Sequence, residues 1–148
     1  EAALAWFRLA EDDFRLIAAE NPQDVEMQLE YADAISWTST TLMHLARFED
    51  SLDARQRHRE LLVQLDQQAA SPDWRVRRHI VTAHLRTIQT LIAMQDIGAA
   101  RNGIATVRPL IEQLRDHDPE NSDWQDAELF LAGHEQSLGA LVRQNNQP

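Results

Sequence analysis

Apolar residues recur along the chain at intervals of three or four positions, the spacing that places side chains on one face of an α-helix. Polar turns interrupt this pattern, and three of them contain proline: Asn21-Pro22, Ser71-Pro72 and Asp118-Pro119. Each turn combines a helix-capping residue with proline, which is tolerated in the first turn of a helix because its missing N–H would be unpaired there. The pattern predicts six helices, at roughly 1–19, 23–46, 48–68, 73–95, 98–117 and 122–143.

The segments between the turns match one another at a separation of about 49 residues. At an offset of 49, Leu42, Leu45, Phe48 and Ser51 correspond to Leu91, Met94, Ile97 and Ala100, and at an offset of 50 Trp74, Ile80, Val81 and Ile88 correspond to Trp124, Phe130, Leu131 and Leu138. A hairpin of two such helices cannot bury all of its apolar surface alone, so neighbouring hairpins must stack. The expected fold is all-α, with about six helices in antiparallel hairpins that form one domain over residues 1–143.

Two stretches carry a family resemblance. The turn from Asp118 to Gln125, and the run from Trp37 to Arg55 with its Leu42, Leu45-Ala46-Arg47-Phe48 and Ser51-Leu52 pattern, resemble tetratricopeptide-type repeats attached to bacterial signalling proteins. The resemblance covers nearly the whole chain, although the family's usual period of ~34 residues is shorter. It implies a right-handed superhelix whose first helix in each pair lines a concave face that binds peptides or protein segments. Those helices would be 23–46, 73–95 and 122–143.

The fifth helix contains two residues that disfavour a helix. Pro109 removes one backbone hydrogen bond and clashes with the preceding turn, at a cost of ~3 kcal/mol or more. We therefore expect a kink or break near Arg108, and Gly103 weakens the same helix further.

The last helix has the pattern of an array end. Asp126 and Glu135 occupy the positions of Val76 and Leu85, and acidic residues at these positions suit a terminal helix with a solvated outer face. We expect the array to stop near residue 143 and a disordered tail to follow over 144–148.

Composition narrows the classes of function. The formal net charge of −10 argues against nucleic-acid binding, which needs clustered cations. The absence of cysteine excludes disulfides and thiolate zinc sites. No apolar run approaches the ~20 residues that span a bilayer, so we expect no membrane insertion by this segment. The compartment stays open, with the cytoplasm favoured and the periplasm as the alternative, and the start at Glu1 inside a helical pattern suggests a fragment of a longer polypeptide.

Catalytic and metal-binding patterns do not emerge from the sequence. His79 and His84 are five positions apart, about 140° around a helix, so they do not converge on one ion. His134-Glu135 begins like a metalloprotease helix, but Leu138 stands where the second histidine is needed. We therefore expect no enzymatic activity, no cofactor and no metal.

The central concave helix has a basic face, which is the main candidate site. The face consists of Arg75, Arg78, His79, Thr82, Arg86 and Gln89. Guanidinium groups pair in bidentate fashion with carboxylates, so this strip would hold an acidic partner segment. In the alternative, the same groups pair between adjacent helices, because the repeat alignment sets Glu26 against Arg75, Glu30 against His79 and Asp33 against Thr82.

Tryptophans are the second group of candidates. Trp37 occupies the position equivalent to Arg86, where it would anchor a partner in the groove or serve in packing. Trp6, Trp74 and Trp124 are expected in the core or at helix starts.

The sequence therefore predicts a non-enzymatic module that binds a peptide or protein segment on its concave face. The alternative is a structural role, either as a homodimer or as a domain that transmits state to an attached catalytic or DNA-binding domain.

Overall fold

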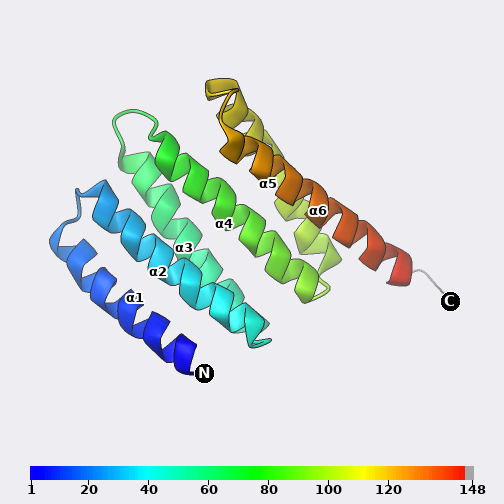
Figure 1. Ribbon diagram of the computed structural model, residues 1–148, viewed down its shortest axis with the longest axis horizontal. Helices are drawn as coiled ribbons and strands as arrows, with labels where there is room; N and C mark the ends of the chain where they lie inside the picture. The colour runs from blue at the N-terminus through cyan, green and yellow to red at the C-terminus, as the bar shows by residue number, and fades with distance from the viewer. Residues whose placement is uncertain (146–148) are drawn as a thin grey trace. The chain divides into compact units, whose positions relative to one another are not determined.

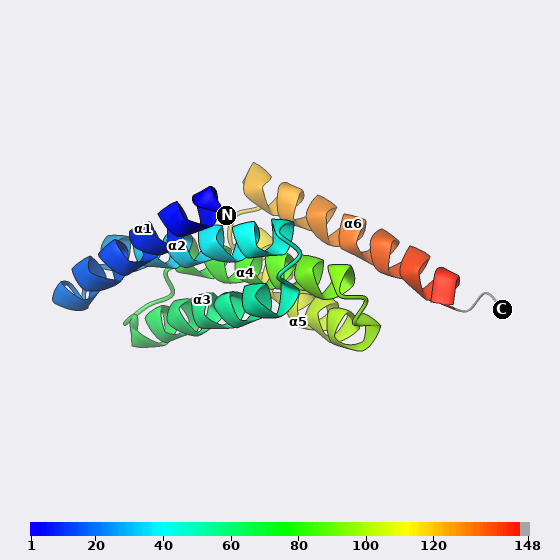
Figure 2. The same cartoon turned by 90° about the horizontal axis from the view of Figure 1, so that it is seen from below.

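The computed structural model describes residues 1–145 and contains six α-helices in this range, with no β-strand among the described residues (Figures 1 and 2). They are α1 (Ala2–Glu20), α2 (Val25–His44), α3 (Phe48–Gln68), α4 (Trp74–Ala93), α5 (Ile97–His117) and α6 (Ser122–Asn145). Each boundary lies within two residues of the predicted one, so the all-α class is confirmed. The predicted tail is wrong for its first two residues, because α6 continues to Asn145 without a helix breaker, and 146–148 lie outside the described residues.

Aspartate and asparagine side chains, rather than the prolines, define the helix starts. The Asp24 carboxylate accepts hydrogen bonds from the backbone N–H groups of Glu26 and Met27 at 3.0 and 3.3 Å. Asp73 and Asn121 accept equivalent bonds at the starts of α4 and α6. The prolines lie one or two positions before these capping residues, in the turns, as the predicted helix starts at 23, 73 and 122 place them.

The turns after α2 and α4 have the same backbone form. Ala46 and Gln95 adopt the left-handed conformation, with φ of 57° and 61°. The next residue in each turn donates a hydrogen bond back into the helix, from Arg47 N to Leu42 O and from Asp96 N to Leu91 O, both at 2.9 Å. This is the Schellman arrangement, in which glycine is the favoured left-handed residue.

We predict that Ala46→Gly stabilises the protein by about 1 kcal/mol, because glycine adopts this φ without the steric penalty of a Cβ. The matched control is Ala132→Gly, at an exposed helical position of α6, which is expected to destabilise by about 1 kcal/mol. Urea unfolding monitored by circular dichroism measures both changes. Equal losses in the two variants would contradict the left-handed turn.

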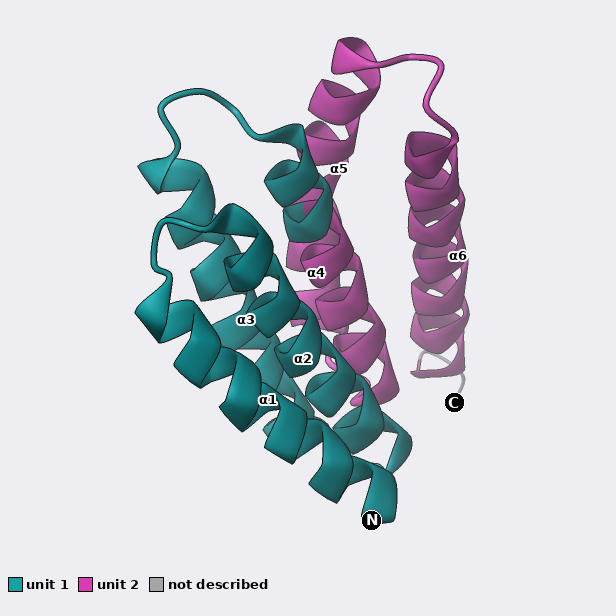
Figure 3. Cartoon of the chain, turned by 60° about the vertical axis from the view of Figure 1, so that its left-hand side comes forward, with its two compact units in different colours: residues 1–80 teal, residues 81–148 magenta. Residues whose placement is uncertain are grey.

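The helices group into two compact units, residues 1–80 and 81–148, and the boundary falls inside α4 (Figure 3). In the first unit, α2 packs against both α1 and α3. Its core combines Leu4, Ile35, Leu42 and Ala54 with the partly buried Tyr31, Leu45 and Leu61. The organisation as one domain over 1–143 stays a prediction.

In the second unit, α5 and α6 pack against each other as a hairpin. The buried stripe of α5 consists of Ala100, Ile104, Val107, Ile111 and Leu114, and that of α6 of Trp124, Leu131, His134 and Leu138. Asp126 and Glu135 are exposed, as the sequence predicted for a solvated face.

Of the kink or break predicted near Arg108, the break is wrong, because α5 continues from Ile97 to His117 through Pro109, while the kink stays a prediction. Pro109 and Ala105, whose carbonyl loses its hydrogen-bond partner, both lie on the exposed side of the helix. Water can therefore satisfy that carbonyl, while the buried stripe holds the helix on both sides of the proline.

Gly103 has a packing role that the sequence did not reveal. A Cβ built on Gly103 would lie 2.8 Å from Cγ1 of Ile88, a fully buried residue of α4. Gly133, in α6, has no such neighbour within 4 Å. The close approach of α5 to this part of α4 therefore requires glycine at position 103.

We predict opposite effects for two Gly→Ala substitutions. Gly133→Ala is expected to stabilise by about 1 kcal/mol through helix propensity alone. Gly103→Ala gains the same propensity but forces the buried Ile88 side chain to shift, so a net loss of about 1–2 kcal/mol is expected. Chemical denaturation of both variants measures the difference, and stabilisation by Gly103→Ala would disprove the contact.

Candidate functional site

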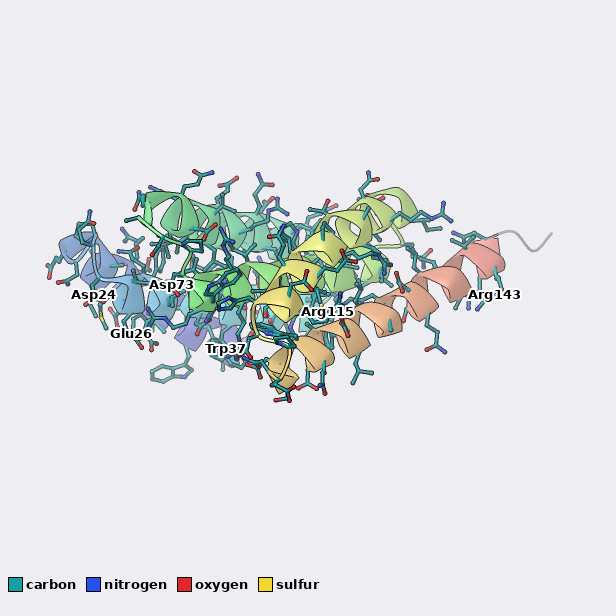
Figure 4. The ribbon with its side chains drawn as sticks, turned by 90° about the horizontal axis from the view of Figure 1, so that it is seen from above. Asp24, Glu26, Trp37, Asp73, Arg115 and Arg143 are labelled. Carbon is teal, nitrogen blue, oxygen red and sulfur yellow. The ribbon has the colours of Figure 1, made fainter. Side chains whose placement is uncertain are left out.

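One face of α2 brings together three acidic residues of the predicted pairing between helices and the candidate tryptophan. Glu26, Glu30, Asp33 and Trp37 follow one another at spacings of four, three and four, so they share one side of the helix. α2 contains no arginine or lysine. Figure 4 shows Glu26 and Trp37 on this helix together with the capping Asp24. The face is therefore acidic, with an aromatic residue toward its C-terminal end.

Arg75, the first residue of the predicted basic strip, is already engaged by carboxylates. Its Nε and Nη2 donate to Oδ1 and Oδ2 of Asp73 at 3.2 and 2.9 Å, and Nη1 lies 3.6 Å from Oε2 of Glu26. The hydrogen bond from Arg75 lowers the pKa of Asp73 below its ordinary value. The contact with Glu26 is the one that the repeat alignment predicted for pairing between helices.

His79 contacts a different carboxylate from the predicted one. Its Nδ1 lies 3.4 Å from Oδ1 of Asp33, whereas the alignment had set it against Glu30. Within residues 1–145, no ion pair is recorded for Glu30, which is exposed. Arg78 is also exposed, one position before His79.

The remainder of the basic strip belongs to the second unit. Thr82 is exposed. Arg86 donates from Nη1 to Oε1 of Gln89 at 3.3 Å, and its guanidinium lies 5.0 Å from the centroid of the Phe130 ring. This guanidinium is therefore held by an amide and an aromatic face rather than by a carboxylate.

Trp37 forms an exposed aromatic pair. Its ring lies parallel to that of Phe7 in α1, with centroids 6.1 Å apart and 13° between the planes. The Trp37 side chain is nevertheless 58% exposed, so most of its surface is open to a partner. Trp124 is buried as predicted, but Trp6 is 73% exposed, and its predicted core position is wrong. α1 packs through the side that carries Leu4 and Ala18, and Trp6 lies on the opposite side.

The sequence reasoning missed a buried polar pair in α3. Arg55 and His58 are 0% and 2% exposed, and Arg55 Nη2 donates to Thr40 Oγ1 at 3.0 Å. Neither ring nitrogen of His58 has a hydrogen-bond partner. The repeat alignment could have revealed their burial, because an offset of 49 sets Arg55 and His58 against the apolar residues Ile104 and Val107 of α5.

Burial is the main cause of an unusual titration at His58. It lowers the pKa of this imidazole to about 4; the charge of Arg55 and that of His79 also lower it, and Asp33 opposes them. His58 is therefore neutral in the folded protein at physiological pH.

A cleft of about 350 Å³ opens beside α1, α2 and α3 of the first unit. Two of its charged lining residues pair with each other, since Arg57 Nη1 lies 2.5 Å from Glu11 Oε1. Asp50 also lines the cleft and pairs at 2.6 Å with Arg47, which does not line it. The pair of Arg57 and Glu11 therefore joins α3 to α1 at this cleft.

Metal and membrane features are absent from the part of the chain that is described. Over 1–145, no group of three or more His, Cys, Asp or Glu residues comes together in a way that could hold a metal ion. None of the helices described here is both long enough and apolar enough to cross a membrane.

Comparison with known proteins gives no match to a family model, to a curated protein or to a solved structure.

We predict that acid destabilises the protein through His58. The unfolded imidazole takes up a proton below pH 6.5 while the folded one stays neutral down to about pH 4, so the free energy of unfolding falls as the pH drops through this window. Between pH 8 and pH 5 the loss from this group is about 2 kcal/mol.

The His58→Leu variant tests this pH dependence, since no recorded hydrogen bond to the imidazole is lost. Its stability relative to the parent at pH 8 reports packing alone, and the additional difference at pH 5 reports protonation. We expect the variant to gain about 2 kcal/mol on the parent between the two pH values. If the free energy of unfolding falls equally in the variant and the parent between pH 8 and pH 5, His58 does not control the loss of stability in acid.

Proposed function

We propose that this chain is a non-enzymatic protein-interaction module of tetratricopeptide-like type, and that the exposed face of α2 holds a segment of a partner protein. The observation that carries the proposal is Trp37, a large aromatic side chain that is 58% exposed and fixed by its stacking on Phe7. Tryptophan is among the residues that most often dominate the free energy of binding at protein interfaces. A side chain already held in place loses little conformational entropy when a partner binds.

The charges beside Trp37 favour a basic partner rather than the acidic one predicted from the sequence. Arg75 is shared between Asp73 and Glu26, so a partner carboxylate would have to compete with both. Glu30 lies on the Trp37 face with no recorded ion pair in residues 1–145. A chain with a net charge of −10 also attracts cationic partners over a distance.

The spacing on α2 defines the partner segment further. Glu30 and Trp37 are seven positions apart, which is about 10.5 Å along the helix axis. Residues three apart in an extended polyproline II segment span about 9 Å and lie on the same side of it, because this conformation repeats every three residues. We therefore propose an extended segment with two basic residues three positions apart, one paired with Glu30 and the other stacked over Trp37.

A peptide-display selection on the immobilised chain tests this function. We expect the selected peptides to be enriched in arginine and lysine and to bind Trp37→Ala and Glu30→Arg about tenfold more weakly than the parent. Glu20→Arg, at the exposed C-terminal end of α1, is the matched charge-reversal control and should change binding by less than about twofold.

Three outcomes would count against the proposal. Failure to enrich any peptide would argue against an interaction module. Peptides insensitive to Trp37→Ala would move the site away from α2. Acidic peptides that require Arg75 would reinstate the basic strip as the binding site.

A further inference from the structure

α1 has an exposed apolar stripe in a position where other helices are buried. α3 and α5 each bury five residues at spacings of four, three, four and three: Ser51, Arg55, His58, Leu62 and Leu65 in α3, and Ala100, Ile104, Val107, Ile111 and Leu114 in α5. α1 has a stripe of the same spacing, and all five of its positions are exposed: Ala2, Trp6, Leu9, Asp13 and Leu16.

The exposure along this stripe is large for apolar residues. Trp6, Leu9 and Leu16 are 73%, 59% and 56% exposed, and Ile17 beside them is 40% exposed. Contiguous apolar surface of this kind marks an interaction site more often than a solvated face. Asp13 places one carboxylate within the stripe.

The second unit has a surface with the complementary chemistry. A cleft of about 490 Å³ lies between α5 and α6, with Ile104, Leu138 and Val142 as its apolar lining. Arg101 and Arg143 also line it, and no ion pair is recorded for either among the described residues. Figure 4 shows Arg143 near the C-terminal end of α6. Glu135 also lines the cleft, and its carboxylate is held by Arg108.

These two arginines are informative because carboxylates outnumber arginines by 24 to 14 in this chain. Seven of the fourteen arginines have recorded carboxylate partners: Arg15, Arg47, Arg57, Arg75, Arg77, Arg108 and Arg115. Arg86 is held by Gln89 and the Phe130 ring instead. Two cations that converge on an apolar cleft without such a partner fit an apolar helix that carries a carboxylate.

We propose that the α1 stripe of one molecule docks in the α5–α6 cleft of a second copy. Trp6, Leu9 and Leu16 cover the apolar lining, and Asp13 pairs with Arg101 or Arg143. α1 has 19 residues, about 28 Å, while α5 and α6 have 21 and 24, so the hairpin is long enough to accommodate it. Because the two surfaces differ, the association is head-to-tail, and it uses none of the residues of the proposed partner site on α2.

Sedimentation velocity over a range from micromolar to near-millimolar concentration tests the association. The weight-average mass of the parent chain is expected to rise with concentration. Leu9→Ser, in the stripe, should weaken association at least tenfold. Leu129→Ser is the matched control and should leave the association unchanged. Leu129 is 71% exposed on α6, but it lies nine positions from Leu138, which places it on the opposite side of the helix from the cleft residue.

Charge reversal distinguishes the head-to-tail arrangement from a symmetric one. Asp13→Arg places a cation opposite the arginines, and Arg101→Glu/Arg143→Glu places carboxylates opposite Asp13, so each variant alone should stay monomeric. An equimolar mixture restores opposite charges and should associate again. Circular dichroism checks that both variants fold as the parent does.

A parent chain that stays monomeric at every concentration would overturn the proposal. Association of the Arg101→Glu/Arg143→Glu variant alone, at the parent's strength, would also overturn it and would indicate pairing of α1 with α1. A mixture of the two charge variants that fails to associate would exclude the assigned charge pair. None of these outcomes affects the peptide-binding test on α2.

Discussion

The fold depends on the need of each helix to cover its apolar side chains with neighbouring helices. α2 meets this need on two sides, since it packs between α1 and α3 and buries eight residues. α5 and α6 meet it as a hairpin with matching buried stripes. α1 meets it on one side only, through Leu4 and Ala18, which leaves Trp6 and Leu9 in solvent. The surfaces available for binding are therefore those that helix packing leaves uncovered.

Helical spacing and turn residues were enough to predict the six helices, because both are local properties of the chain. The failures involve contacts between helices. Pro109 is tolerated because it lies on the exposed side of a helix whose other side is buried, and Gly103 is needed because Ile88 approaches it closely. Neither the direction of a face nor the proximity of a neighbour can be read from one helix alone. The same reason explains the wrong prediction for Trp6, which depended on knowing which side of α1 packs.

The candidate site could be predicted only in part. Periodicity identified the residues that share a helix face, and the alignment anticipated the contact between Arg75 and Glu26. It did not anticipate that Asp73, the residue that caps α4, would take the same guanidinium in a bidentate interaction. A capping carboxylate two positions away competes at higher effective concentration than a residue on another helix. Local geometry thus changed the charge that the surface offers to a partner.

In a chain with more carboxylates than arginines, the arginines indicate more about binding than the acids do. An unpaired carboxylate is expected here on numbers alone, so Glu30 gains significance only from its position on the same face as Trp37. An arginine without a carboxylate partner is less expected, because the chain has 24 carboxylates and only 14 arginines. Arg101 and Arg143 meet that condition beside an apolar cleft, whereas Arg75 does not. The basic strip that dominates the sequence is for this reason a weaker binding candidate than two arginines that the sequence leaves inconspicuous.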